Sequence, residues 1–241
     1  MKGSGLRTGV LGTLLLLLSI LVVGRAPSDG ISNSNLVEVT FAESESHVGP
    51  GPHPEDESDH YKLVQGGIRW FSGSTVEYQI NNTTAAQAAA VNSAIATIDG
   101  FITTRAFAHV QGTTQINPCT GQPNSISWLA GDGPGGVLAF TAVCVDTKAK
   151  EILGFRIAFD SLDTWSTSGE ADKFDVENVA GHEIGHVAGL EHVNSPKDGC
   201  LTMYKFSDLG ETQKRTPGFG DKLGLDKLYT TGDVTPGQCG S

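Results

Sequence analysis

The stretch GHEIGHVAGLEH, residues 181–192, holds three histidines, two glutamates and three glycines. At 3.6 residues per turn, His182 and His186 lie on the same face of a helix. The apolar residues of this segment fall on a different face, so the helix can bury one side and present two imidazoles from the other. Those apolar residues are Val176, Ala180, Ile184 and Val187. Two imidazoles one turn apart are suited to bind one cation.

The residues after this pair predict a complete metal site. Gly189 is expected to end the helix, because glycine adopts positive φ without steric cost. The chain can then turn back and bring His192 to the same point as a third ligand. Three nitrogens suit tetrahedral Zn²⁺ and leave one position for water, whose pKa the metal lowers to about 7. Glu183 lies between the helix ligands and is placed to take the proton of that water.

The full pattern HEIGHVAGLEH resembles the HExxHxxGxxH signature of metzincin zinc endopeptidases. Those enzymes also have a methionine turn beneath the metal, and CLTMY supplies Met203, eleven residues after His192. Within the metzincins the sequence is most similar to the matrixin branch, which is matrix-metalloproteinase-like, over residues 66–230. The resemblance implies a zinc-dependent endopeptidase that acts on protein or peptide substrates.

Three further segments carry the matrixin resemblance, namely DGPGGVLAF (132–140), AFDSLDTW (158–165) and DKLGLDKLY (221–229). In matrixins the first two segments share a structural calcium ion. The resemblance therefore implies an oxygen cage of the kind that Ca²⁺ prefers. Its ligands would be the carboxylates of Asp132, Asp160 and Asp163 and the backbone oxygens of Gly133, Gly135 and Val137. The alternative is a pair of solvated acidic turns.

The resemblance also implies how a substrate binds. In matrixins the edge strand after the glycine loop pairs with an extended peptide, and here that strand comprises Val137, Leu138, Ala139 and Phe140. Backbone pairing gives affinity without sequence preference, while pockets select side chains. The segment that follows Met203, beginning with Tyr204, would line the main specificity pocket.

The sequence departs from the family pattern at several positions. Matrixins hold a second, structural zinc with histidines at the places where this chain has Phe140 and Ala158, so we expect one zinc and not two. No cysteine precedes Cys119, so the cysteine with which the matrixin pro-segment blocks the metal is missing. Lys205 stands where astacin-like members have a tyrosine two residues after the methionine.

Periodicity along the chain predicts an α+β fold, because strands come first and helices pack on one side. Val76, Tyr78 and Ile80 alternate with polar residues, as in a half-buried strand. Together with the resemblance, this pattern implies a metzincin-type zincin catalytic domain with a mixed, mostly five-stranded sheet. Strands are expected at 75–80, 107–110, 125–129, 137–145 and 152–159, a long helix at 85–104, the active-site helix at 174–188 and a C-terminal helix at 219–229.

The ends of the chain differ in composition from this domain. Residues 1–26 read as a secretory signal peptide, with an uncleaved membrane anchor as the alternative. Residues 27–60 are acidic and turn-rich, which predicts a disordered linker or a short pro-segment. Three histidines in that segment could bind metal weakly, although a solvated linker is the simpler interpretation; they are His47, His53 and His60. The catalytic domain is expected at 61–241.

Charge and cysteine usage indicate an exported protein. Loss of residues 1–26 removes three basic residues and no acid, which lowers the formal charge from −11 to −14. This charge argues against nucleic acid and anionic membranes as partners, and we expect a secreted monomer. All four cysteines follow the leader, which predicts two disulfides with three possible connectivities. Proximity favours Cys119–Cys144 and Cys200–Cys239.

Two other functions remain open at this point. The chain could be a secreted binding or adhesion module in which zinc serves stability, or a zinc hydrolase of a non-peptide bond. The intact Glu183 and the lack of an evident fourth protein ligand argue against a purely structural zinc. The metal itself does not dictate the substrate.

Overall fold

The computed structural model describes residues 35–45, 58–232 and 234–236, which all belong to the unit Ser34–Ser241. The expected signal peptide lies outside these residues, as do His47 and His53. Within the described part of the chain, no helix has both the length and the apolar character needed to cross a bilayer.

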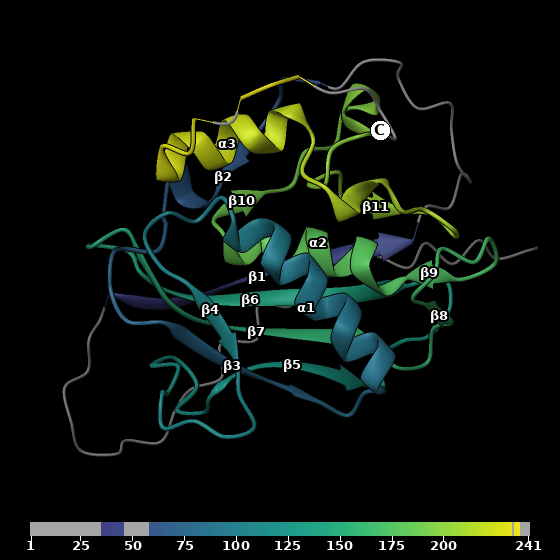
Figure 1. Ribbon diagram of the computed structural model, residues 1–241, viewed down its shortest axis with the longest axis horizontal. Coiled ribbons are helices and arrows are strands. Elements are labelled where there is room, and N and C mark those ends of the chain that lie inside the picture. Colours follow the sequence, from purple (N-terminus) through teal and green to yellow (C-terminus); the bar gives the residue numbers. More distant parts are fainter. Residues whose placement is uncertain (1–34, 46–57, 233, 237–241) are drawn as a thin grey trace, which may run out of the picture. The chain divides into compact units, whose positions relative to one another are not determined.

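One mixed sheet forms the scaffold, and it contains the five strands predicted from periodicity (Figure 1). These are β3 (Val76–Asn81), β4 (Phe107–His109), β5 (Asn124–Leu129), β6 (Val137–Asp146) and β7 (Glu151–Asp160). β6 and β7 are antiparallel, whereas β7, β5, β3 and β4 are parallel neighbours. β6 is apolar on both faces and almost fully buried, which is typical of a central strand.

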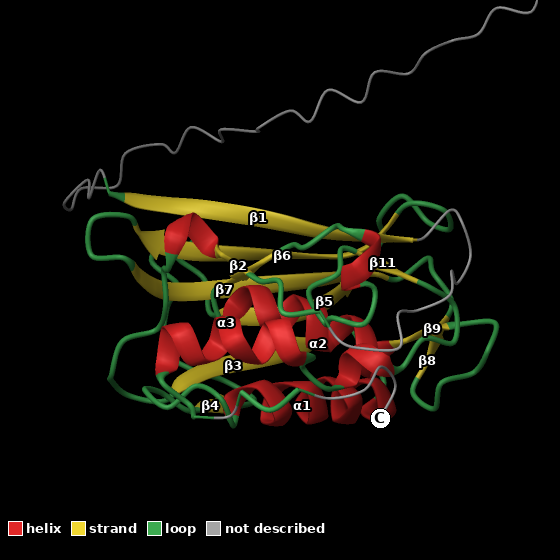
Figure 2. Cartoon of the chain, turned by 90° about the horizontal axis from the view of Figure 1, so that it is seen from above, coloured by secondary structure: helices red, strands yellow, loops and turns green. Residues whose placement is uncertain are grey.

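The helices lie on one face of this sheet (Figure 2), as an α+β fold requires. α1 (Ala85–Asp99) begins at a capping box between Thr84 and Gln87 and ends just before Gly100. α2 (Val176–Val187) begins at Asp175, whose carboxylate accepts the backbone N–H of Asn178. α3 (Phe219–Tyr229) is the C-terminal helix.

Short elements connect these parts. Two small ladders join β2 (Lys62–Leu63) to β10 (Leu190–Glu191) and β8 (Trp165–Ser166) to β9 (Phe174–Asp175). Three single turns of 3-10 helix are η1 (Val64–Gly66), η2 (Pro196–Asp198) and η3 (Gln213–Arg215). The segment 193–217 contains only η2, η3 and the two-residue strand β11 (Phe206–Ser207).

A long strand, β1 (Leu36–Glu45), lies in the segment for which composition predicts disorder. That prediction is wrong for residues 36–45. β1 pairs antiparallel with β6 from Leu36 to Ser44, and its last residues pair with β11, so the sheet has seven strands in the order β11-β1-β6-β7-β5-β3-β4. The physical reason is that β6 offers a row of backbone donors and acceptors, which an extended segment satisfies whatever its charge.

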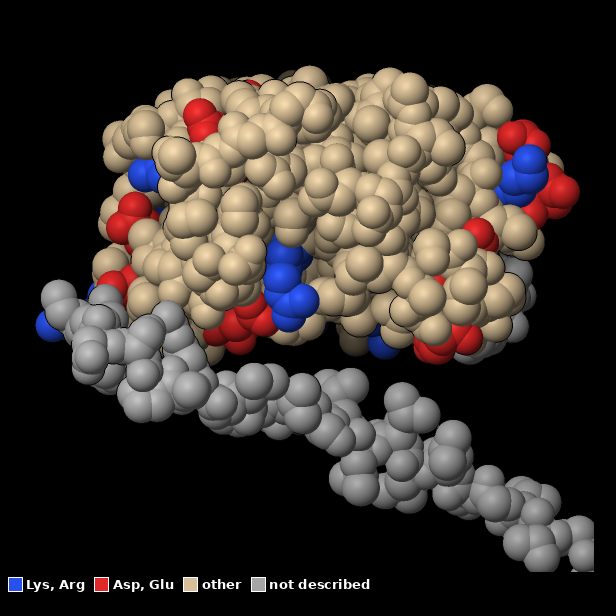
Figure 3. All heavy atoms as spheres, turned by 90° about the horizontal axis from the view of Figure 1, so that it is seen from below, with Lys and Arg blue, Asp and Glu red and all other residues tan. Residues whose placement is uncertain are grey.

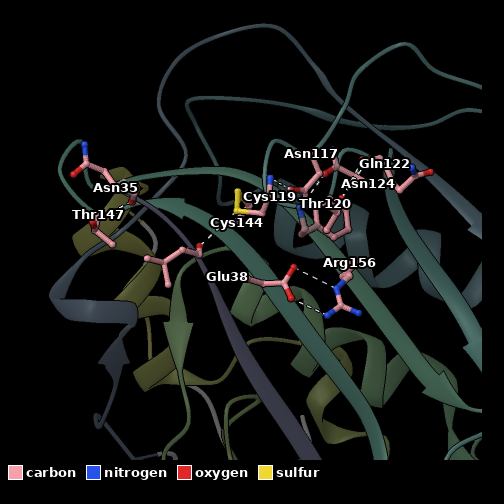
Figure 4. Close-up of a disulfide and its surroundings, with 12 residues drawn as sticks. Asn35, Glu38, Asn117, Cys119, Thr120, Gln122, Asn124, Cys144, Thr147 and Arg156 are labelled. Atoms are coloured by element: carbon pink, nitrogen blue, oxygen red, sulfur yellow. Dashed lines mark hydrogen bonds and ion pairs between the residues drawn. A yellow bond between two sulfur atoms is a disulfide. The ribbon is translucent and has the colours of Figure 1, made fainter. Parts of the chain in front are cut away.

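The outer half of β1 is held near a disulfide (Figure 4). Cys119 and Cys144 are bonded, with an S–S distance of 2.00 Å, which confirms the pairing favoured by proximity. Arg156 on β7 forms an ion pair with Glu38 of β1, with an N–O distance of 2.7 Å. Cys200 is also disulfide-bonded, and Cys239, its expected partner, lies outside the described residues.

Candidate metal centre

Three imidazoles converge where α2 meets the loop that follows it. The Nε2 atom of His192 lies 3.0 Å from the Nε2 atoms of both His182 and His186. Two nitrogens bound to one tetrahedral zinc ion stand roughly 3.3 Å apart, since each Zn–N bond is about 2.05 Å. His182 and His186 are fully buried, whereas His192 is partly buried.

Gly189 allows the chain to place His192 at this point. Its φ is +98°, and a Cβ atom there would lie 2.4 Å from the backbone oxygen of Ile68. The chain then runs through β10, where Leu190 O accepts a hydrogen bond from His186. The predicted role of Gly189 as the residue that ends the helix and reverses the chain agrees with this geometry.

The far side of each helix imidazole is hydrogen-bonded to a carbonyl. His182 Nδ1 lies 2.7 Å from Thr202 O, and His186 Nδ1 lies 2.9 Å from Leu190 O. These bonds place the ring proton on Nδ1 and leave the Nε2 lone pair free for a metal. Burial lowers the pKa of His182 and His186 well below the usual value, and that of His192 to about 4. The rings are therefore neutral, as metal ligands must be.

Glu183 lies beside the three histidines and is fully buried. The hydroxyl of Thr141, on β6, donates to its Oε2 atom. Its Oε1 atom has no hydrogen-bond partner among the described residues. Burial raises the pKa of Glu183 well above 4.5, and the nearby Glu43 carboxylate raises it further. A buried carboxyl oxygen without a partner among the described residues, on a group with a raised pKa and beside the converging imidazoles, fits a general base.

Met203 packs against α2 between the two helix histidines. It is buried, and a Cβ atom at Gly185 would collide with its sulfur, so a larger residue there would displace the Met203 side chain. Asp221, on α3, accepts the backbone N–H groups of Thr202 and Met203 and fixes the turn. The structure thus places Met203 where the metzincin resemblance implies it.

β1 runs through the site, which the sequence did not lead us to expect. The ring of Phe41 stacks on His186 with a centroid distance of 4.1 Å and an interplanar angle of 9°. Glu43 is fully buried, and its Oε1 atom lies 3.8 Å from His182 Nδ1. Phe41 and Glu43 belong to no recognisable sequence motif. The alternation of Val37, Val39 and Phe41 is typical of a strand and is the signal that could have predicted β1.

The expected substrate strand is therefore not a free edge in this structure. On β6, Val137, Ala139 and Phe140 pair with Ser44, Glu43 and Ala42 of β1, and Leu138 is buried. The expectation that 137–140 is an edge strand is wrong in this structure, because β1 pairs along it. Phe140 and Ala158, which replace histidines of the family, face each other across β6 and β7.

Tyr204, also expected to contact substrate, begins the segment that flanks the inner end of β1. Its backbone oxygen accepts a hydrogen bond from the Lys214 ammonium at 2.8 Å. Lys205 O accepts the backbone N–H of Ser44 at 3.4 Å, and β11 follows. β1 thus ends between β6 on one side and the segment 204–207 on the other.

The acidic residues expected to bind calcium gather at the end of β7. The Asp160 carboxylate accepts the backbone N–H groups of Gly131, Gly133 and Leu162, and so holds the glycine loop. Asp163 is buried, and neither of its oxygens accepts a hydrogen bond from the described residues. Burial raises the pKa of Asp163 to about 6, and the nearby carboxylates contribute to this shift; these are Asp160, Glu45 and Asp132.

Asp132 and the glycine loop complete this cluster. Asp132 Oδ1 accepts the backbone N–H of Val137 at 3.1 Å. Gly133 and Gly135 both adopt positive φ, which glycine allows without cost. Sequence reasoning missed Glu45, because it assigned this residue to the disordered segment.

Comparison with known proteins agrees with this geometry. The family model described as Matrixin matches residues 69–230. Metalloendoproteinase 1 of Glycine max is 40% identical over 104 residues, which cover 41% of this chain and 30% of that protein. Stromelysin-3 of Homo sapiens is 30% identical over 124 residues, 44% of this chain and 23% of that protein. The matches thus span less than a third of the length of these relatives.

Two solved structures of myroilysin also show a likeness, at 15% identity and TM-scores of 0.39 and 0.41. They cover 67% and 78% of this chain and 82% and 98% of the matched chains. The family assignment depends on the sequence match, which extends over more than half of the chain and includes all three histidines and Glu183. The chain belongs to the matrixin family.

Proposed function

We propose that this chain is a secreted zinc-dependent endopeptidase that hydrolyses peptide bonds, with His182, His186 and His192 as zinc ligands and Glu183 as general base. One observation carries the proposal: three neutral imidazole nitrogens converge beside a buried Glu183 oxygen that has no hydrogen-bond partner among the described residues. A zinc ion held there would supply a Lewis acid that polarises the scissile carbonyl and acidifies a neighbouring water molecule.

The residues of the chain perform the proton transfers. Glu183 takes a proton from water and gives it to the departing amine, so that one group serves as base and then as acid. The Thr141 hydroxyl orients the Glu183 carboxylate through its hydrogen bond to Oε2. Oε1 then remains available to take the proton of the water molecule. Burial raises the pKa of Glu183, which makes the carboxylate a stronger base toward the water molecule.

The peptide substrate would take the place of β1. β1 is itself an extended peptide on β6, and β-strand addition of this kind provides affinity through main-chain hydrogen bonds. Tyr204 and the residues after it lie on the opposite side of that position. A substrate can bind in this way only after β1 has left.

An extracellular location is part of the proposal. The apolar leader, the Cys119–Cys144 disulfide and the acidic charge all favour export. Among the described residues on the face drawn in Figure 3, basic side chains are few and lie close to acidic ones. The described residues on that face offer no continuous basic stripe for a phosphate backbone, which agrees with a protein substrate.

Chelation tests the proposed activity. The purified protein is expected to contain one zinc per chain and to cleave unfolded casein, and 1,10-phenanthroline is expected to abolish cleavage until zinc is restored. Metal analysis and gel-based proteolysis check this result. If zinc were bound but no protein or peptide were cleaved, the endopeptidase function would be wrong. The remaining functions would be a binding module and a hydrolase of a non-peptide bond. A content of two tightly held zinc ions would contradict the single site.

We also propose that Asp163 forms part of a calcium site with Asp132, Asp160 and the loop that includes Gly133, Gly135 and Val137. Both Asp163 oxygens are buried, receive no hydrogen bond from the part of the chain that the structure describes, and lie close to three other carboxylates. Such an arrangement is costly unless a cation neutralises it. Oxygen donors of this type fit Ca²⁺. Because Asp160 already anchors three backbone amides, substitution of Asp163 is the cleaner probe.

Calcium is expected to raise the melting temperature of the wild-type chain, and Asp163→Asn is expected to abolish most of that increase. A ligand that binds only the folded state stabilises it by about 2.7 kcal/mol at a hundredfold excess over its Kd. Without calcium, Asp163→Asn should melt at or above the wild-type temperature, since it removes repulsion. Asp172→Asn, an exposed acid nearby in the chain, is the control. Equal calcium responses in wild type and Asp163→Asn, with zinc constant, would refute the site.

A further inference from the structure

A buried lysine lies behind the metal centre and has no part in the proposed proton transfers. Lys214, from η3, is fully buried. Its ammonium donates to Tyr204 O at 2.8 Å and to Phe206 O at 2.6 Å. It also donates to Ser207 Oγ at 3.0 Å. A charge this deeply buried is costly to maintain without a counterion.

The counterion comes from β1. Glu43 Oε1 lies 2.6 Å from the Lys214 ammonium, and Ser207 Oγ donates to the same oxygen at 2.6 Å. All three groups are buried, and the imidazole of His182 forms one wall at 3.8 Å. The Glu43 carboxylate is thus enclosed by an ammonium group, a hydroxyl and an imidazole, directly beside the first proposed zinc ligand.

The backbone that carries this glutamate passes the general base. The backbone N–H of Glu43 points toward the Glu183 carboxylate. Ser44 N donates to Lys205 O, and Glu45 N donates to Gly136 O at 3.1 Å, so the chain stays extended between the two sides of the site. The Glu43 amide therefore faces the proposed proton donor, while the Glu43 side chain reaches Lys214 and Ser207.

We propose that Lys214 and Ser207 form a specificity pocket for a carboxylate side chain, carried by the residue immediately after the bond that is hydrolysed. This inference rests on the proposed endopeptidase function and specifies its substrate class: extended peptides with glutamate at that position. Glu43 is the chain's own occupant of the pocket. Aspartate is one methylene shorter and loses the direct contact, whereas glutamine keeps the shape but lacks the charge.

Three matched peptides test the pocket. Each has the sequence of residues 36–45 with extended ends, and they differ only in glutamate, glutamine or leucine at the position of Glu43. The enzyme is the full chain with Glu43→Ala, which leaves the pocket free. The glutamate peptide is expected to have a kcat/KM at least tenfold above the other two, since a charge-assisted hydrogen bond to a buried partner is lost in each of them. Mass spectrometry of the new amino terminus locates the cut.

Variants at Lys214 separate its charge from its bulk. In the same background, Lys214→Met is expected to reverse the order, so that the leucine peptide is cleaved fastest, because the pocket floor becomes apolar. Lys214→Arg should retain the preference for glutamate. Zinc content and circular dichroism report whether each variant folds. If Lys214→Met does not fold, denatured casein is digested with the Glu43→Ala chain instead. The proposal then depends on how often glutamate follows the cleaved bond.

The possible outcomes distinguish this inference from the proposed function. Enrichment of glutamate after the cut, lost in Lys214→Met, supports the pocket. Cleavage without that enrichment, or with leucine preferred by the Lys214-containing enzyme, overturns the pocket and leaves the endopeptidase intact. No cleavage of peptides or casein by the zinc-loaded wild-type and Glu43→Ala chains overturns the proposed function and the pocket with it.

Discussion

Glu183→Gln is expected to lower kcat/KM for peptide hydrolysis by about a thousandfold while zinc remains bound. General acid–base catalysis contributes roughly 10²–10⁴-fold, and glutamine can neither accept nor deliver the proton. Glutamine preserves the size of the side chain, and its amide oxygen can still accept the hydrogen bond from the Thr141 hydroxyl. The three ligands are unchanged, so metal content should stay near one ion per chain. Steady-state kinetics and metal analysis check both parts.

Glu177→Gln provides the matched control for this experiment. Glu177 is in the first turn of the same helix, accepts a hydrogen bond from Ser93 and lies away from the three histidines. It should retain nearly full activity. If Glu183→Gln cleaved at the rate of this control, Glu183 would not be the base, and another group would have to take the proton from water.

The metal centre could be predicted from the sequence because its parts are local. The helix itself sets the spacing of His182, Glu183 and His186. After Gly189 the chain can turn back along only a few paths, so the position of His192 could be predicted as well. The long alternating or apolar segments of β6 and β7 and the capped helix α1 also appeared near the expected residues. In each case the periodic pattern extended over many residues and agreed with the signals at its ends.

The resident strand and the lysine pocket could not be predicted in this way. Glu43 and Lys214 are 171 residues apart, and no local pattern links them. The acidic composition of 27–60 favours disorder, and the short alternation in β1 competes poorly with it. β1 is ordered because its backbone pairs with β6 and because Glu43 forms a buried ion pair with Lys214. The partners in both interactions come from other parts of the fold. Lys214 itself reads in the sequence as an ordinary surface lysine.

Glu43→Ala is expected to raise the initial rate of peptide cleavage by the full chain about a hundredfold. Removing one partner of a buried ion pair costs 3–5 kcal/mol, and 1.4 kcal/mol corresponds to a factor of ten in an equilibrium constant. The contacts of Lys214 with Ser207 and two carbonyls reduce this penalty, which favours the lower end of the range. Since β1 occupies the position on β6 that a peptide needs, looser docking of β1 translates into more open enzyme.

The comparison with Glu38→Ala makes this result decisive, because Glu38 is on the same strand but forms a partly exposed ion pair with Arg156. Exposed pairs contribute 0–1 kcal/mol, so Glu38→Ala should change the rate by less than about fivefold. Phe41→Ala, which removes a buried ring stacked on His186, should give an increase similar to that of Glu43→Ala, since truncation of a buried phenylalanine costs about 3–5 kcal/mol. The measurement is the initial rate of cleavage of a short peptide, recorded while the amino-terminal segment that contains β1 is still uncleaved. If Glu43→Ala instead lowered both activity and melting temperature, β1 would be a permanent strand of the working enzyme, and substrates would have to reach the histidines from elsewhere.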